Sequence, residues 1–99
     1  MTKGQNMHTT ETHAVEFLVT DSICYEVIRQ TNKTISLRKC LSGEKISGEW
    51  PVVYSAAVSN PEGETITLRL RKDGTFRRAN WANPMRFTSQ PAFRTDYAF

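Results

Sequence analysis

The sequence predicts an all-β fold: an antiparallel meander of about six or seven short strands, curled into a small SH3-like or half-open barrel. Apolar and polar residues alternate with period two in several short runs, which is typical of half-buried strands. Turn-forming residues separate these runs, most clearly at Ser59-Asn60-Pro61-Glu62-Gly63. No window of ten or more residues keeps the period of about 3.6 that marks an amphipathic helix.

Length and composition are those of one ordinary globular domain. The chain has 99 residues, of which 38% are hydrophobic and 23% charged. No apolar run approaches the roughly 18 residues of a membrane-spanning helix, so we expect no membrane partner. Residues 1–12 lack the apolar segment of a signal peptide and are expected to form a flexible tail, followed by a single β domain over 13–99. We therefore expect the protein to act in the cytoplasm of the cell that makes it.

The strands are expected in the short apolar or alternating segments, and the loops where prolines, glycines and polar residues gather. The expected strands are His13–Val19, Ile23–Arg29, Lys33–Leu41, Trp50–Val58, Glu64–Arg71, Thr75–Asn80 and Phe93–Phe99. The expected long loops are Leu41–Glu49 and Trp81–Pro91.

The first hairpin turns at Gln30-Thr31-Asn32. With Asn32 in the left-handed position of a three-residue loop, Arg29 pairs with Lys33. Val27 then faces Ile35 and Tyr25 faces Leu37 on the core side. Cys24 and Cys40 fall diagonally on the other side, which is poor geometry for a disulfide. Cytosolic conditions also favour the reduced thiols.

The second hairpin is the most informative segment of the chain. Residues 65–71 alternate apolar side chains with arginines, and Asp73-Gly74 is a strong hairpin turn. Pairing Arg71 with Thr75 directs four side chains to the core, namely Ile66, Leu68, Leu70 and Phe76. It directs Arg69, Arg71 and Arg77 together to the outer face. Trp50 and Tyr54, on the longer apolar run before this hairpin, are also expected in the core.

Charge is unevenly distributed along the chain. Residues 1–64 carry six Lys/Arg and eight Asp/Glu, a net charge of −2, whereas residues 65–99 carry seven Lys/Arg and two Asp, a net charge of +5. A basic segment fits an anionic partner, although a solvated arginine-rich strand face has the same composition. The residues we expect to bind a partner are Arg69, Arg71, Lys72, Arg77, Arg78, Trp81, Arg86 and Arg94.

The aromatic residues after position 80 have three interpretations. Aromatic rings interleaved with arginines stack on unpaired bases. Trp, Tyr and Arg are also the residues that dominate protein–protein interfaces. Alternatively, the rings close one end of the barrel as part of the core.

The sequence contains no recognisable catalytic motif. We find no Gly-rich phosphate loop, no nucleophile elbow, and no histidine flanked by a suitable Ser, Cys or carboxylate. Two cysteines without nearby ligands are too few for a structural zinc site. We therefore expect no enzymatic activity, no metal and no cofactor.

Several short motifs resemble a family of small bacteriophage proteins of unassigned function. They are Asn60-Pro61-Glu62-Gly63, the strand end Leu70-Arg71-Lys72-Asp73-Gly74 followed by an aromatic residue, and the C-terminal Asp96-Tyr97-Ala98-Phe99. Tyr25-Glu26-Val27-Ile28 and Lys33-Thr34-Ile35-Ser36-Leu37-Arg38 add to the resemblance, which covers residues 21–99. Asn32, where glycine is usual, and the segment Trp81–Pro91 depart from the pattern. The resemblance implies a phage accessory protein in the host cytoplasm and assigns no catalytic residues.

Two functions follow from these observations. The favoured one is a non-catalytic binding module that docks on a host or defence protein and inhibits it. The alternative is a stand-alone nucleic-acid-binding barrel that uses its basic C-terminal third. Both remain compatible with a monomer or with a dimer formed through a strand edge.

Overall fold

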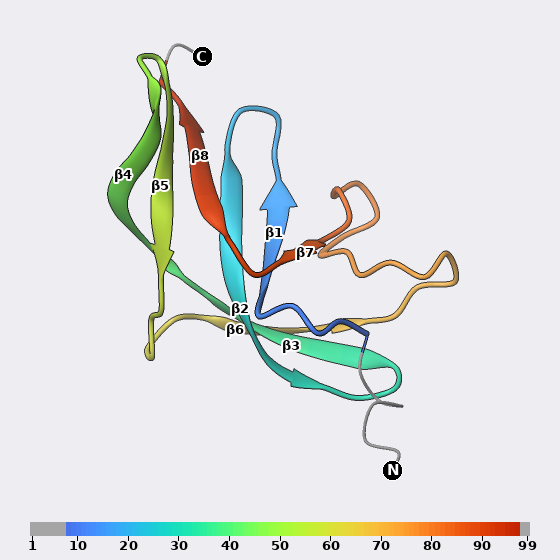
Figure 1. Ribbon diagram of the computed structural model, residues 1–99. Helices are drawn as coiled ribbons and strands as arrows, with labels where there is room; N and C mark the ends of the chain where they lie inside the picture. The colour runs from blue at the N-terminus through green and yellow to red at the C-terminus, as the bar shows by residue number, and fades with distance from the viewer. Residues whose placement is uncertain (1–7, 98–99) are drawn as a thin grey trace.

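The computed structural model describes residues 8–97 as eight antiparallel strands in two sheets, and the all-β prediction is confirmed (Figure 1). The strands are β1 His13–Phe17, β2 Ser22–Gln30, β3 Thr34–Lys39, β4 Leu41–Glu49, β5 Val52–Val58, β6 Thr65–Arg69, β7 Arg86–Thr88 and β8 Ala92–Asp96. The five-stranded sheet has the order β6-β3-β2-β1-β7, and the three-stranded sheet has the order β4-β5-β8. The sheets do not join in one continuous ladder, so the barrel is half-open. The described part of the chain contains no helix with the length and apolarity that a membrane crossing requires.

Both faces of the five-stranded sheet bury apolar side chains. One face carries the main core, to which Ala14 of β1 belongs. The long segment between β6 and β7 covers this core. The core residues are Ala14, Tyr25, Ile35, Leu37, Leu68, Phe76 and Met85. The opposite face holds a smaller cluster of Val15, Cys24 and Cys40, against which Ala57 and Phe93 of the three-stranded sheet pack. Because alternate residues of β1 pack into the two clusters, β1 and β2 lie at the centre of the molecule.

β4 corrects the sequence analysis, which predicted a loop over Leu41–Glu49. This segment has polar and charged side chains on both faces and no apolar alternation, so it lacks the usual strand signal. It forms a strand because it lies at a sheet edge, where exposed polar residues are tolerated. Gly43 permits close pairing, since a Cβ atom there would lie 2.6 Å from Cγ2 of Val58.

The segment after β6 also differs from the expected hairpin. Arg71 does pair with Thr75, whose carbonyl accepts a hydrogen bond from the Arg71 N–H at 2.9 Å. Residues 75–80 then leave the sheet and form no strand. Arg86–Thr88, expected within a loop, instead forms β7 and pairs with β1. Phe76 explains the departure: its ring is 2% exposed and inserts into the main core, which draws this segment across the sheet.

The β2–β3 register is offset by two residues from the expected one. Val27 pairs with Leu37, and a bulge at Ile28 separates this pair from the pair between Arg29 and Ser36. The turn is also different, because the Thr31 N–H donates to the Thr34 carbonyl at 2.9 Å. The offset of two residues up to Val27 keeps Tyr25, Val27, Ile35 and Leu37 on the expected core face, so these core assignments are correct. Beyond the bulge, Arg29 pairs with Ser36 of the opposite face.

The expected tail is only partly described, because residues 1–7 lie outside the described residues. From residue 8 the chain is attached to the domain, unlike a free tail. The His8 N–H donates to Oε1 of Gln30 at 2.7 Å, and the His8 ring lies edge-on to Phe76 at 5.0 Å. The Thr12 carbonyl accepts a hydrogen bond from the Val27 N–H at 3.0 Å.

Two aromatic residues and one leucine expected in the core lie at the surface. Trp50 is 74% exposed at the end of β4 and stacks on Tyr97, with ring centroids 5.4 Å apart. Tyr54 on β5 is 36% exposed, and Leu70 is 38% exposed. Leu70 lies beyond the end of β6, and Tyr54 lines a cleft between the two sheets.

The face assignment of β6 generates a stability prediction. Leu68→Ala is expected to lower the free energy of unfolding by about 2–4 kcal/mol, because it leaves a cavity among Ile35, Phe76 and the rest of the main core. Thr67→Ala, on the exposed face of the same strand, is the matched control and is expected to cost well under about 1 kcal/mol. Urea unfolding curves measure both. Equal losses would contradict the packing of β6.

Candidate functional site

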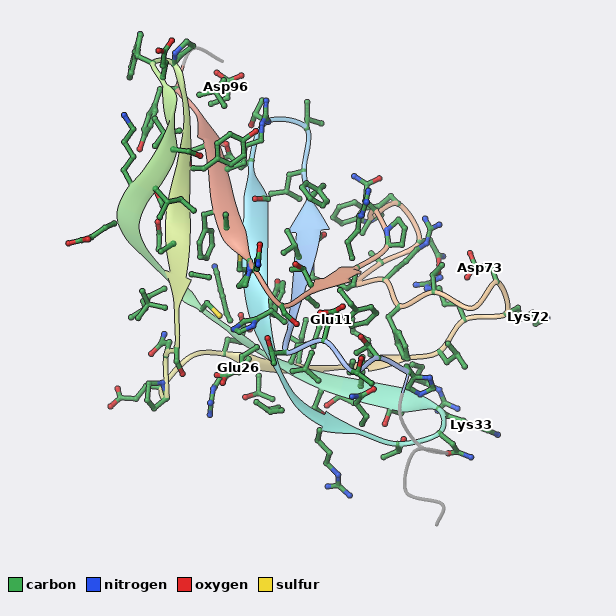
Figure 2. The ribbon with its side chains drawn as sticks, viewed as in Figure 1. Glu11, Glu26, Lys33, Lys72, Asp73 and Asp96 are labelled. Atoms are coloured by element: carbon green, nitrogen blue, oxygen red, sulfur yellow. The ribbon has the colours of Figure 1, made fainter. Side chains whose placement is uncertain are left out.

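The structure separates the eight expected binding residues into two groups. Arg69, Arg71 and Lys72 lie on β6 and the loop that follows it. Lys72 marks the far tip of that loop in Figure 2, well away from β8 and its terminal Asp96. The second group is Arg78, Trp81, Arg86 and Arg94, which gather around the end of β1 at Phe17. Arg77 lies between the groups, bonded to Asp73 of one loop and to the Ala82 carbonyl near the other.

The first group does not form the shared arginine face that the expected hairpin implied. Arg69 and Lys72 are exposed. Arg71 donates through Nη1 to Oδ1 of Asn80 at 2.6 Å. Arg77 donates through Nη1 to the Ala82 carbonyl at 3.0 Å and lies 3.7 Å from the Asp73 carboxylate. Arg71 and Arg77 therefore stabilise the loops on which they lie.

The second group is organised by a buried ion pair. Glu16 points from β1 toward the same face as Ala14, and its side chain is fully buried. Nε and Nη2 of Arg78 donate to its two carboxylate oxygens at 2.9 and 3.0 Å, a bidentate geometry. The hydrogen bonds and charge of Glu16 raise the pKa of Arg78. Burial, and to a lesser extent the Glu16 charge, raises the pKa of the neighbouring Tyr25. The pair attaches the segment between β6 and β7 to the centre of the sheet.

Arg78 also positions Trp81. Its guanidinium carbon lies 5.2 Å from the centroid of the indole, which is the geometry of a cation–π contact. Trp81 nevertheless remains 76% exposed. A large aromatic side chain is thus held at the surface by a cation that is itself fixed by a buried carboxylate.

Apolar side chains surround Trp81. Phe17 ends β1, and Leu18 and Val19 follow it; the three residues are 40%, 37% and 88% exposed. Together with Trp81 and Asn83 they line a shallow hollow of about 200 Å³. The Asn83 amide donates to the Phe17 carbonyl, which joins the two sides of the hollow. We refer to Phe17, Leu18, Val19, Arg78, Trp81 and Asn83 as the Trp81 surface.

A larger cleft lies on the other side of Phe17. It has a volume of about 440 Å³ and separates β1 and β7 from β5 and β8. The lining residues are Val15, Phe17, Ser22, Tyr54, Arg86, Phe87, Thr88, Gln90, Pro91, Ala92 and Arg94. We call it the β7–β8 cleft. Its lining contains two arginines and no carboxylate, so a bound group there experiences a positive potential.

Side chains at the start of β2 hold the two sheets together beside this cleft. Ser22, which is 3% exposed, accepts a hydrogen bond from the Arg94 N–H at 2.7 Å and donates to the Ala92 carbonyl at 3.3 Å. Oδ1 of Asp21 accepts from the Asp96 N–H at 3.2 Å. These side chains take the place of a neighbouring strand along β8, so the sheets meet without a ladder and the cleft stays open.

Sequence reasoning missed two contributors to the site. Phe17 was expected inside a strand that continued to Val19, but β1 ends at Phe17 and leaves the next two apolar residues exposed. Tyr54 was expected in the core. The available signal was the unbroken apolar run from Phe17 to Val19, which is unusual for residues that enter a turn at Thr20-Asp21.

Cys24 lies on β2 and Cys40 between β3 and β4, directly opposite each other and closer than the expected diagonal. The Cys40 N–H donates to the Cys24 carbonyl at 3.0 Å, and both side chains are buried as free thiols. Burial, together with the nearby Cys40, raises the pKa of Cys24 to about 12. Such a thiol is a poor nucleophile at neutral pH. Among residues 8–97, no three His, Cys, Asp or Glu side chains gather in a way that would hold a metal ion.

The raised pKa of Cys24 predicts a loss of stability in alkaline solution. Between about pH 9 and about pH 12 the unfolded chain releases the thiol proton while the folded chain retains it, so the free energy of unfolding falls as pH rises. Urea unfolding at a series of pH values measures this slope. Cys24→Ala is expected to flatten it, and the remaining slope reports on Tyr25 and Cys40, whose pKa values are raised as well. An unchanged slope in Cys24→Ala would contradict the assignment.

Loss of the Arg78 guanidinium is expected to destabilise the protein strongly. Arg78→Ala leaves the Glu16 carboxylate buried without a partner, which costs about 3 kcal/mol or more. Arg69→Ala, at an exposed arginine on β6, is the matched control and should change stability by no more than about 0.5 kcal/mol. Denaturant unfolding at neutral pH compares the two. Similar small losses would mean that Glu16 is not buried as described.

Comparison with known proteins identifies no relative: no protein-family model, no curated protein and no solved structure matches this chain. The function is therefore inferred from the chemistry of the Trp81 surface and the β7–β8 cleft.

Proposed function

We propose that this protein is a non-catalytic binding module that docks on a host or defence protein and inhibits it, as an accessory protein of a bacteriophage in the host cytoplasm. The observation that carries the proposal is Trp81. This side chain is 76% exposed, yet it is held by Arg78, which in turn is fixed by the buried Glu16. The resemblance of the turn motifs to small phage proteins supports the context.

The composition of the Trp81 surface favours a protein partner. Tryptophan and arginine are enriched among the residues that contribute most binding energy at protein interfaces. Such anchors are most effective when they are pre-organised, because little conformational entropy is then lost on binding. Phe17, Leu18 and Val19 surround the anchor with apolar area, which a partner's side chains would exclude from water.

The chemistry of the β7–β8 cleft favours binding over catalysis. The described lining of the β7–β8 cleft offers arginine, serine, threonine, glutamine and tyrosine side chains, with no carboxylate, histidine or cysteine to act as a general base. The two thiols are buried elsewhere in a protonated state.

The distribution of charge weakens the nucleic-acid alternative. Affinity for nucleic acid depends mainly on cations that are available to phosphates. In the basic C-terminal third, Arg78 is paired with Glu16 and Arg77 with Asp73. Arg71 is bonded to Asn80 and lies apart from the Trp81 surface. The basic residues thus do not form one continuous track for a phosphate backbone.

Affinity capture from a bacterial lysate, with and without nuclease, tests the proposal. We expect one protein to be retained after nuclease treatment, and the purified protein to lose its activity when the binding module is added. Trp81→Ala is expected to weaken this complex by about thirtyfold or more, the effect of losing an interface hot spot. Trp50→Ala is the matched control, because Trp50 is similarly exposed at 74% but lies at the end of β4.

Loss of all retained partners on nuclease treatment would overturn the proposal in favour of nucleic-acid binding. In that case log affinity should fall steeply and linearly with log salt concentration. Equal effects of the two tryptophan substitutions would show that the Trp81 surface is not the docking site.

A further inference from the structure

We infer that the β7–β8 cleft binds an extended segment of the partner protein that carries a carboxylate side chain next to an apolar one. This inference rests on the proposed function and adds the chemistry of the partner. It concerns a different surface from the one on which Trp81 lies, although Phe17 borders both.

The shape of the cleft fits an extended chain. Arg86, Phe87 and Thr88 are consecutive residues of a strand, and all three line the cleft. Side chains alternate across a strand, and the Phe87 ring packs against Phe76 in the main core with centroids 6.3 Å apart. Phe87 therefore reaches the cleft through its backbone, so the cleft runs along β7. Among the strands that the structure describes, β7 is also the last of its sheet and pairs with β1 alone. An edge of this kind accepts a peptide as an added strand.

The charge of the cleft selects a carboxylate. Arg86 and Arg94 line it from the two sheets, and no acidic side chain lines it with them. The Arg86 guanidinium lies 5.7 Å from the centroid of the Phe17 ring, and no ion pair is formed by it within residues 8–97. Arg94 donates through Nη1 to the Thr20 carbonyl, which uses part of the five-donor capacity of the guanidinium. Both groups can therefore donate to a carboxylate in the bidentate manner.

Aromatic rings beside the arginines select an apolar neighbour. Phe17 is 40% exposed on the β1 side, and Tyr54 is 36% exposed on the β5 side. An extended peptide places successive side chains on alternate sides at a rise of about 3.3 Å per residue. An acidic residue next to an apolar one thus reaches both the arginines and the rings. A peptide also pairs with a strand edge through its backbone, which a nucleic acid cannot do.

Nuclear magnetic resonance titration of the ¹⁵N-labelled full chain tests the inference. The probe is acetyl-Glu-Phe-Glu-Phe-Glu-amide, and the control probe is the same peptide with lysine in place of glutamate. We expect the acidic peptide to shift the amide resonances of Arg86–Thr88 and Ala92–Arg94, and the basic peptide to leave them unchanged. Arg86→Ala should weaken binding of the acidic peptide about tenfold or more. Arg69→Ala, at an exposed arginine on the opposite edge strand β6, should not.

Charge reversal at Arg86 distinguishes an electrostatic effect on binding from a loss of folding. Arg86 is exposed, so Arg86→Glu should fold normally and should exchange the preference, binding the basic peptide in place of the acidic one. Failure of both peptides to shift the cleft resonances would overturn the inference, as would tighter binding of a ten-residue oligothymidylate at the same positions. Capture of the host protein by Arg86→Glu with unchanged affinity would also overturn it, while leaving the proposed function of the Trp81 surface intact.

Discussion

The Glu16–Arg78 ion pair is the interaction on which the rest of the structure depends. A carboxylate with no exposure to solvent is tolerated only with a hydrogen-bonded counter-charge, and Arg78 supplies both hydrogen bonds and charge. Because Arg78 belongs to the irregular segment between β6 and β7, this pair ties sixteen residues of loop to the central strand β1. The same guanidinium makes the cation–π contact with Trp81. Core packing, loop position and surface chemistry are therefore linked through one side chain.

The half-open architecture has a local cause with a functional consequence. Where a closed barrel would pair β8 with β2, Ser22 and Asp21 satisfy the β8 backbone through their side chains. These bonds fix the sheets relative to one another, but a cleft remains between β1 and β7 on one side and β5 and β8 on the other. Two arginines and flanking aromatic rings line this cleft. A binding surface made from sheet edges in this way needs no large pocket, which a chain of 99 residues has little volume to build.

The sequence predicted those features that depend on local alternation and missed those that depend on tertiary context. The core residues of β2, β3 and β6 were predicted correctly because period-two patterning determines which side chains are buried. β4 was missed because an exposed edge strand needs no apolar pattern. The β2–β3 register was wrong because the turn closes between Thr31 and Thr34, and a bulge at Ile28 shifts the pairing once more. For the candidate site, composition indicated the arginines and aromatic residues of the C-terminal third but not Phe17 or Tyr54. It could not indicate that Glu16, 62 residues earlier, would bury itself against Arg78, since long-range pairing of charges is not encoded in any local pattern.

The central claim is that the Glu16–Arg78 pair holds Trp81 in place before any partner binds. The most direct test is ¹⁵N relaxation of the Trp81 indole N–H, in the parent protein and in Glu16→Gln. The account predicts an order parameter near the value of about 0.85 that is typical of rigid backbone in the parent, and a clear fall in the variant. An order parameter below about 0.6 in the parent would contradict the account, because Trp81 would then be a freely moving side chain.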